Sequence, residues 1–292
     1  MNFITTRRRG DSGQDVLVAK QRLFELGCYD PSIASVSSET FGSDTRAAVR
    51  KFQRTQGLEA DGIIGPLTWA ALFGESTPAP VVDTGLPANI SQAAAEAILR
   101  DLSSVSATRR AIVIDALQYA YDPAVPAKYP LSLYIRGGNL YNTDLQPNVI
   151  TLARIASGAA RQPEYYDGGR QEMMEHAVRA NPSITGADCS GGVVGLLRHA
   201  QVVKAKFDLS ADGFNQSSSY LKIDKADLAP ADLLHKPGHL GLYAGGGYGV
   251  EWMGGAYGCQ LTRVSARRGW NFVKDKLDKS GNWTDFLHPK YY

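Results

Sequence analysis

The segment ADCSGGVVGLLRHA, residues 187–200, holds one of the three cysteines in the 292-residue chain. Asp188 is a good N-cap and an apolar run follows, so the pattern predicts a helix that begins at Cys189. Backbone N–H groups at such a tip favour a thiolate and could hold an oxyanion, so we expect a lowered pKa for the Cys189 thiol. Ser190, Gly191 and Gly192 would leave room for a substrate backbone. A buried, inert cysteine is the alternative, and the segment alone does not exclude it.

A thiol nucleophile needs a base, and the chain offers five histidines as candidates. His199 lies ten residues after the cysteine on the same predicted helix, about 15 Å along the axis, which is too far. We expect His176, in a polar helix, and His288, near the C-terminus, to be surface residues. His235 and His239 remain, and both belong to the strand-rich part of the chain that follows residue 189.

The segment GHLGLYAGGGYGVEW, residues 238–252, has the pattern of two strands joined by a glycine turn. Leu240 and Leu242 would face the core, which leaves His239 on the opposite face. A turn centred on Gly245 would pair His239 with Glu251, and directly opposed Cβ atoms lie roughly 5 Å apart. A carboxylate there could hold the imidazole tautomer and stabilise its cation. An exposed strand histidine and a solvated glutamate are the alternatives that the pattern leaves open.

Proline and glycine are concentrated in GESTPAPVVDTGLPANI, residues 74–90, which has no apolar periodicity. Such a segment is typical of a linker between domains. We expect a small domain at residues 10–75, a linker at 76–90 and a larger domain at 91–292. Apolar residues spaced three or four apart predict three helices in the small domain, within residues 11–27, 43–57 and 65–73.

Three motifs of the small domain point to a known family. F-G-x-x-T, V-x-x-F-Q-x-x-x-G-L and D-G-x-x-G-x-x-T-W resemble the three-helix peptidoglycan-binding module of bacterial cell-wall enzymes. The resemblance implies a small all-α domain whose partner is bacterial peptidoglycan. The first loop, residues 28–40, is longer than is usual in that family. Trp69 could stack on a sugar, but a domain this small needs its large side chains inside, which favours a core residue.

In the larger domain, helical patterns come first and strand patterns follow residue 189, which predicts an α+β fold with an antiparallel sheet. The sequences D-C-S-G at 188–191, A-D-L-L-H at 231–235 and G-H-L-G-L-Y-A-G at 238–245 resemble NlpC-type cysteine peptidases of the cell wall. Y-x-x-G-G at 134–138 resembles the family's segment whose tyrosine lines the active site. The resemblance covers about residues 107–265 and implies a papain-like fold, with helices packed on the sheet.

The same resemblance implies three catalytic residues and three substrate-binding residues. The catalytic residues would be the nucleophile Cys189, the base His239 and the third member Glu251. The substrate-binding residues would be Tyr134, Asp188 and Ser190. This chain departs from the family in two ways. The third catalytic residue is more often His, Asn or Gln, and the longer gap between the motifs indicates an insertion at about residues 139–187.

The activity that this resemblance implies is hydrolysis of an amide bond in the peptide stem of peptidoglycan. The bond would be the one on the carboxyl side of a D-γ-glutamyl residue, as in a D-γ-glutamyl endopeptidase. An N-acetylmuramoyl-L-alanine amidase is an alternative with the same chemistry, and a non-catalytic wall-binding protein is a second alternative. The mechanism requires no metal and no cofactor.

Composition narrows the remaining classes of function. The formal net charge of +2 argues against nucleic acid or an anionic membrane as partner. Three cysteines without C-x-x-C spacing argue against a disulfide scaffold and a structural zinc site. The chain has no transmembrane run, and its start lacks the apolar segment of a secretory signal. We therefore expect action at the bacterial cell wall after release by lysis, a secretion machine or a phage pore, as for an endolysin. The oligomeric state is not predicted.

Overall fold

A computed structural model describes residues 5–33, 35–56, 58, 60–73 and 85–292 of the chain. The chain divides into two compact units, Met1–Asp83 and Thr84–Tyr292. Of the predicted linker at 76–90, residues 76–84 lie outside the described part. Within the described ranges, no helix is both long enough and apolar enough to cross a membrane.

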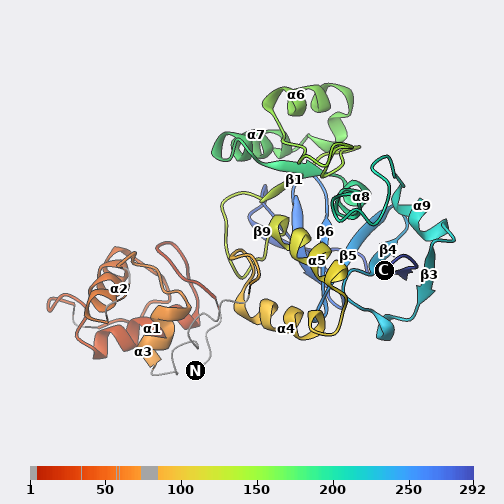
Figure 1. The fold of residues 1–292 in the computed structure, drawn as a ribbon. Coiled ribbons are helices and arrows are strands. Elements are labelled where there is room, and N and C mark those ends of the chain that lie inside the picture. Colours follow the sequence, from red (N-terminus) through yellow and green to blue (C-terminus); the bar gives the residue numbers. More distant parts are fainter. Residues whose placement is uncertain (1–4, 34, 57, 59, 74–84) are drawn as a thin grey trace. The chain divides into compact units, whose positions relative to one another are not determined.

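The N-terminal unit contains the three predicted helices, α1 (Gln14–Glu25), α2 (Ser43–Thr55) and α3 (Pro66–Phe73) (Figure 1). Their apolar faces meet in one core, to which Leu23, Phe52 and Trp69 contribute. Trp69 is among the most deeply buried large side chains, so the core interpretation of this residue is confirmed.

The C-terminal unit mixes helices with a six-stranded antiparallel sheet, as predicted. The strand order is β3-β10-β4-β5-β6-β7. In that order the bounds are Tyr220–Ile223, Asp285–Pro289, Leu233–Lys236, His239–Gly245, Tyr248–Trp252 and Cys259–Arg263. Two smaller sheets pair β1 (Ser132–Tyr134) with β2 (Thr185–Ala187), and β8 (Arg268–Asn271) with β9 (Lys276–Lys279).

Three helices cover one face of the large sheet, and all three pack against β5: α4 (Gln92–Leu102), α5 (Ala107–Tyr119) and α8 (Cys189–His199) (Figure 1). Leu240 and Leu242 of β5 point into this main core, as the alternation predicted. The opposite face of the sheet holds a second, smaller cluster that includes Tyr243 and Trp283. Since both faces are covered, β5 is buried along its whole length. The short helix α9 (Ala211–Gln216) packs beside β4.

The predicted insertion forms a layer at one end of the C-terminal unit. It contains α6 (Leu152–Arg161), the short 3-10 helix η1 (Pro163–Tyr165) and α7 (Arg170–Ala180) (Figure 1). A separate apolar cluster holds these elements together with the β1 segment, and Met173 and Met174 of α7 belong to it. A second 3-10 helix, η2 (Lys225–Asp227), lies between β3 and β4 in the chain.

The predicted register of the β5–β6 hairpin is wrong by two residues. Leu242 pairs with Val250 and Tyr243 with Gly249, and extending this register places Glu251 opposite Gly241 rather than His239. The difference arises because the register shifts between Tyr243 and Gly245, which moves the centre of the turn along the chain. A shift of two residues preserves the face on which each side chain lies. His239 and Glu251 are therefore diagonal neighbours, and Gly241 between them has no side chain.

Candidate active site

Cys189 is the first residue of α8, and Asp188 is its N-cap, as predicted. The backbone N–H of Gly191 donates to Asp188 Oδ1 at 2.7 Å, and the Ser190 hydroxyl donates to the same oxygen at 3.1 Å. The N–H of Gly137 donates to Asp188 Oδ2 at 2.9 Å. Both carboxylate oxygens thus bind the chain itself and hold the helix tip against the Tyr134 segment.

The Cys189 thiol is almost buried, with 4% of the residue exposed. Sγ lies 3.9 Å from the carbonyl oxygen of Gly238, and the N–H of Leu240 also reaches the sulfur. The thiol therefore contacts the main chain on both sides of His239. Burial raises the pKa of Cys189, and the nearby Asp188 carboxylate raises it further, while the backbone N–H groups of Leu240 and Ser190 lower it. The expected lowering of this pKa is wrong because burial outweighs the helix tip.

The two glycines after the cysteine do not leave room for a substrate, as we had expected. A Cβ at Gly191 would lie 1.9 Å from the carbonyl oxygen of Gly138. A Cβ at Gly192 would lie 2.1 Å from Cε3 of Trp252. The space beside these residues is occupied by the protein, so their small size permits close packing of α8 against its neighbours.

His239, at the start of β5, is 9% exposed and contacts Glu251. Its Nε2 lies 2.7 Å from Glu251 Oε2. The imidazole also stacks on Trp283, with ring centroids 5.5 Å apart and planes inclined by 15°. A carboxylate can only accept a hydrogen bond, so Nε2 carries the proton, and Nδ1 is then the ring nitrogen that can take one. The alternative of an exposed strand histidine is wrong.

Glu251 lies on β6 and is completely buried, at 0% exposure, so the alternative of a solvated glutamate is also wrong. Besides His239, it accepts hydrogen bonds from the Thr262 hydroxyl at 2.7 Å and from Arg267 Nε at 2.7 Å, both to Oε1. Burial raises the pKa of this carboxyl, but the hydrogen bonds from His239 and Arg267 prevail and lower it to about 2. The group is therefore a carboxylate at neutral pH.

Arg267 is a member of this cluster that the sequence did not predict. It is 3% exposed, and its Nη2 also contacts Glu251 Oε2 closely. Nη1 donates to the Ser280 hydroxyl at 2.7 Å and to the carbonyl oxygen of Gly281 at 2.8 Å. The guanidinium lies over the Trp283 ring, 4.4 Å from its centroid. Trp283 thus contacts two of the three partners of Glu251, His239 and Arg267.

Tyr134 ends β1, where it pairs with Ala187 of β2. It belongs to the same buried core as Cys189. Burial raises the pKa of its hydroxyl, and the charges of Cys189 and Asp188 raise it further, which reflects how near these groups are. The structure thus brings the six predicted site residues into two neighbouring groups. Tyr134, Asp188, Cys189 and Ser190 form one, and His239 and Glu251 form the other.

His235 has a different environment from His239. Its Nε2 lies 3.0 Å from Asp212 Oδ1 and its Nδ1 lies 3.0 Å from Asp285 Oδ2. The same Asp212 oxygen accepts the N–H of Gly238 at 2.9 Å. Asp212 therefore fixes the residue whose carbonyl contacts the Cys189 thiol. This network positions the start of β5.

The sequence set aside three further histidines. His176 is exposed, as predicted, and the other two are His199 and His288. His199 Nδ1 lies 2.7 Å from Asp115 Oδ2, and its ring stacks on Tyr141. His288 Nδ1 lies 3.0 Å from Asp232 Oδ1. Neither histidine has a contact with Cys189 in the described part of the chain.

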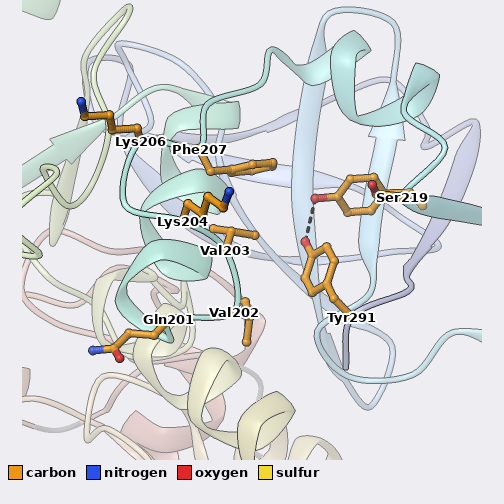
Figure 2. Close-up of a pocket in the computed structure, with 9 residues that line it drawn as sticks. Gln201, Val202, Val203, Lys204, Lys206, Phe207, Ser219 and Tyr291 are labelled. Carbon is orange, nitrogen blue, oxygen red and sulfur yellow. Dashed lines mark hydrogen bonds between the residues drawn. The ribbon is translucent and has the colours of Figure 1, made fainter.

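A cavity of about 740 Å³ lies elsewhere in the C-terminal unit (Figure 2). Its lining comes from the loop after α8, from β3 and from the C-terminal end, and includes Lys204, Phe207 and Tyr291. The hydroxyls of Tyr220 and Tyr291 meet there at 2.6 Å (Figure 2). None of the predicted site residues lines this cavity.

The N-terminal unit carries a recognised domain. Residues 12–72 match the family described as "Putative peptidoglycan binding domain". A curated protein of Kitasatospora aureofaciens, "Uncharacterized protein in bpoA1 3'region", is 60% identical over 68 residues, which are 23% of this chain and 54% of that protein. The chain thus spans about half the length of this relative.

A solved structure, the endolysin of Burkholderia phage AP3, is 24% identical over 55% of this chain and 52% of its own. The TM-score is 0.22, so this likeness carries no argument about the fold. The peptidoglycan-binding domain fits action at the cell wall.

Proposed function

We propose that the chain is a peptidoglycan hydrolase that cleaves an amide bond of the peptide stem. Cys189 is the nucleophile, His239 the base and Glu251 the group that orients the base. The observation that carries the proposal is the 2.7 Å contact between His239 Nε2 and Glu251 Oε2. His239 begins β5, and the residue before it, Gly238, contacts the Cys189 thiol. We also propose that the C-terminal unit has a papain-like fold.

The raised pKa of Cys189 means that the isolated thiol is mostly protonated at neutral pH, so the reaction needs a base. His239 Nδ1 takes the thiol proton, and the resulting imidazolium is stabilised by the Glu251 carboxylate. The sulfur attacks the amide carbon, and the backbone N–H of Cys189 at the tip of α8 stabilises the oxyanion. The nitrogen leaves with the proton from His239, which gives a thioacyl enzyme and a free amine. Water, deprotonated by His239, then releases the acid and restores the thiol.

The N-terminal unit and the resemblance to NlpC-type peptidases support the proposed substrate class. The matched domain over residues 12–72 supports a chain that is held on peptidoglycan. Such tethering raises the local concentration of stem peptides without new contacts at the catalytic residues. We infer that Tyr134, Asp188 and Ser190 flank the bound stem and that the scissile bond follows a D-γ-glutamyl residue. The enzyme would act at the bacterial cell wall.

Digestion of purified muropeptides, followed by mass spectrometry of the products, tests this proposal. A D-γ-glutamyl endopeptidase releases the distal part of the stem and leaves the proximal part on the sugar. Release of the whole stem from the sugar would instead identify an N-acetylmuramoyl-L-alanine amidase. Sedimentation of the protein with cell walls but no product of either kind would identify a non-catalytic wall-binding protein.

A further inference from the structure

One face of the N-terminal unit carries a row of arginines. Arg46, Arg50 and Arg54 follow one another at four-residue spacing on α2, and Arg9 joins them from the N-terminal segment. These four side chains, together with Ser43 and Ala47, line a cavity of about 370 Å³. We call this group the arginine row. Arg50 is half-buried, and the other three arginines are exposed.

The arginine row lacks the carboxylate partners that other arginines of the same unit have. Arg7 pairs with Asp15 at 2.7 Å, and Arg22 pairs with Glu25 at 3.0 Å. Among the described residues, no carboxylate lies within ion-pair distance of the arginine row. Its nearest polar contact is from Arg50 Nε to the carbonyl oxygen of Asp61, at 3.4 Å.

Two nearby carboxylates, Asp61 and Asp44, form no ion pair with the arginine row. Asp61 Oδ1 accepts hydrogen bonds from Gln53 Nε2 at 2.7 Å and from the N–H of Ile63 at 2.8 Å. Asp44 does not line this cavity, although it lines a neighbouring one together with Arg54. Within the part of the chain that the structure describes, no side chain forms an ion pair that neutralises the positive charge of the arginine row.

The stems of Arg46 and Arg50 approach Gly62 closely. This glycine has a φ of +76°, and a Cβ there would lie 2.7 Å from Arg46 Cγ and 3.1 Å from Arg50 Cγ. The stems thus pack across the Gly62 turn. The side chains at four-residue spacing lie on one face of the helix, about 6 Å apart along its axis.

The N-terminus of α2 lies at one end of this cavity, with the acidic Asp44 in its first turn. α2 has 13 residues, and no side chain caps its N-terminus. Ser43, its first residue, lines the cavity. Backbone N–H groups and the helix dipole at such an end attract anions. Like charges at four-residue spacing also repel each other within a helix, and an anionic ligand would relieve that repulsion.

We propose that the arginine row binds the phosphate groups of an anionic cell-wall polymer. Guanidinium groups pair with phosphate through two parallel hydrogen bonds, and several evenly spaced ones suit a ligand with repeated charges better than a single carboxylate. This inference rests on the proposed wall-binding role of the N-terminal unit and adds a second ligand to it. Binding through exposed charges is expected to weaken steeply as salt is added.

The test uses the full chain with Cys189→Ala, so that the walls stay intact. Cell walls that keep their phosphodiester polymers are compared in sedimentation with the same walls after hydrofluoric acid has removed those polymers. We expect the chain to bind the untreated walls about tenfold more tightly or better. The triple variant Arg46→Gln, Arg50→Gln, Arg54→Gln should lose this preference. The control variant Arg100→Gln, Lys225→Gln, Lys274→Gln removes three exposed charges from the other unit and should keep it.

Equal binding of the parent to both walls would overturn the phosphate site and leave the wall-binding role standing. No binding to either wall would overturn both. Competition on the parent chain gives a readout that does not depend on how the variants fold. Soluble polyphosphate should displace the chain from untreated walls, and displacement by polyglutamate but not by polyphosphate would contradict the proposal.

Discussion

The Glu251 carboxylate bridges His239 and Arg267 in the interior of the C-terminal unit. Its Oε2 lies 2.7 Å from His239 Nε2, and its Oε1 lies 2.7 Å from Arg267 Nε. A buried charge is stable only when it is paired and hydrogen-bonded, and the arginine meets that need independently of the histidine. Arg267 thus explains how a glutamate can stay charged in a fully buried position beside His239.

Removing Arg267 should destabilise the fold strongly. Arg267→Ala leaves Glu251 buried without its cation, and such broken pairs cost about 3–5 kcal/mol in the free energy of unfolding. The neighbour Arg268 is exposed, so Arg268→Ala should change that free energy by less than about 0.5 kcal/mol. Urea denaturation of the two variants measures both values. A similar small loss for both would show that the Glu251 pair contributes little.

The lowered pKa of Glu251 predicts a loss of stability in acid. The folded-state pKa, about 2, lies below the ordinary value of 4.5, so the contribution is fully present above about pH 4.5. It is lost as the pH falls through that window towards about 2, and amounts to about 3 kcal/mol. Glu251→Gln cannot titrate, so its unfolding free energy should fall less steeply over the same range. Urea denaturation at several pH values measures this free energy. If it falls equally steeply with pH in the parent and in Glu251→Gln, the account is contradicted.

The raised pKa of Cys189 predicts that its reactivity depends on His239. In a Cys28→Ala background, two thiols remain, Cys189 and Cys259. Cys259 is fully buried, so we expect iodoacetamide to label Cys189 at neutral pH. His239→Ala should slow this labelling about 100-fold or more. The rate in that variant should recover only in alkaline solution, because burial and Asp188 raise the pKa of the Cys189 thiol above its ordinary value. Mass spectrometry of the labelled protein over a range of pH checks this, and equal rates at neutral pH would contradict it.

Gly192 should be intolerant of even one added methyl group. Because a Cβ there would overlap the Trp252 ring, Gly192→Ala forces α8 or Trp252 to move. Overpacking of this kind costs about 1–3 kcal/mol in unfolding free energy. The neighbouring Ser190→Ala removes one hydroxyl from a partly buried position and should cost less. Thermal denaturation of both variants compares them, and a greater loss in Ser190→Ala would refute the packing argument.

Local patterns predicted the parts of the site that are close in the sequence. The Asp188 cap, the start of α8 and the alternation of β5 depend on a few adjacent residues. The contact between His239 and Glu251 was anticipated from an incorrect register, because a slip of two residues keeps both side chains on one face. The predicted contact between the two side chains is present, but the predicted cross-strand pairing of His239 with Glu251 is wrong.

The rest of the site depends on contacts between distant segments. Arg267 follows β7 with no motif around it, and Trp283 lies a further sixteen residues along the chain. No periodicity indicates that both would meet Glu251. The pKa of Cys189 was predicted with the wrong sign because a helix tip can be recognised in the sequence, whereas the burial that opposes it cannot.

The most direct test of the Cys–His mechanism is the rate at which purified muropeptides are cleaved by the parent, Cys189→Ala and Cys28→Ala. Cys28 is also a buried free thiol, but it lies in the N-terminal unit. We predict that Cys28→Ala cleaves at the parental rate and that Cys189→Ala releases no product above the uncatalysed background. Cleavage by Cys189→Ala at the parental rate would contradict the account.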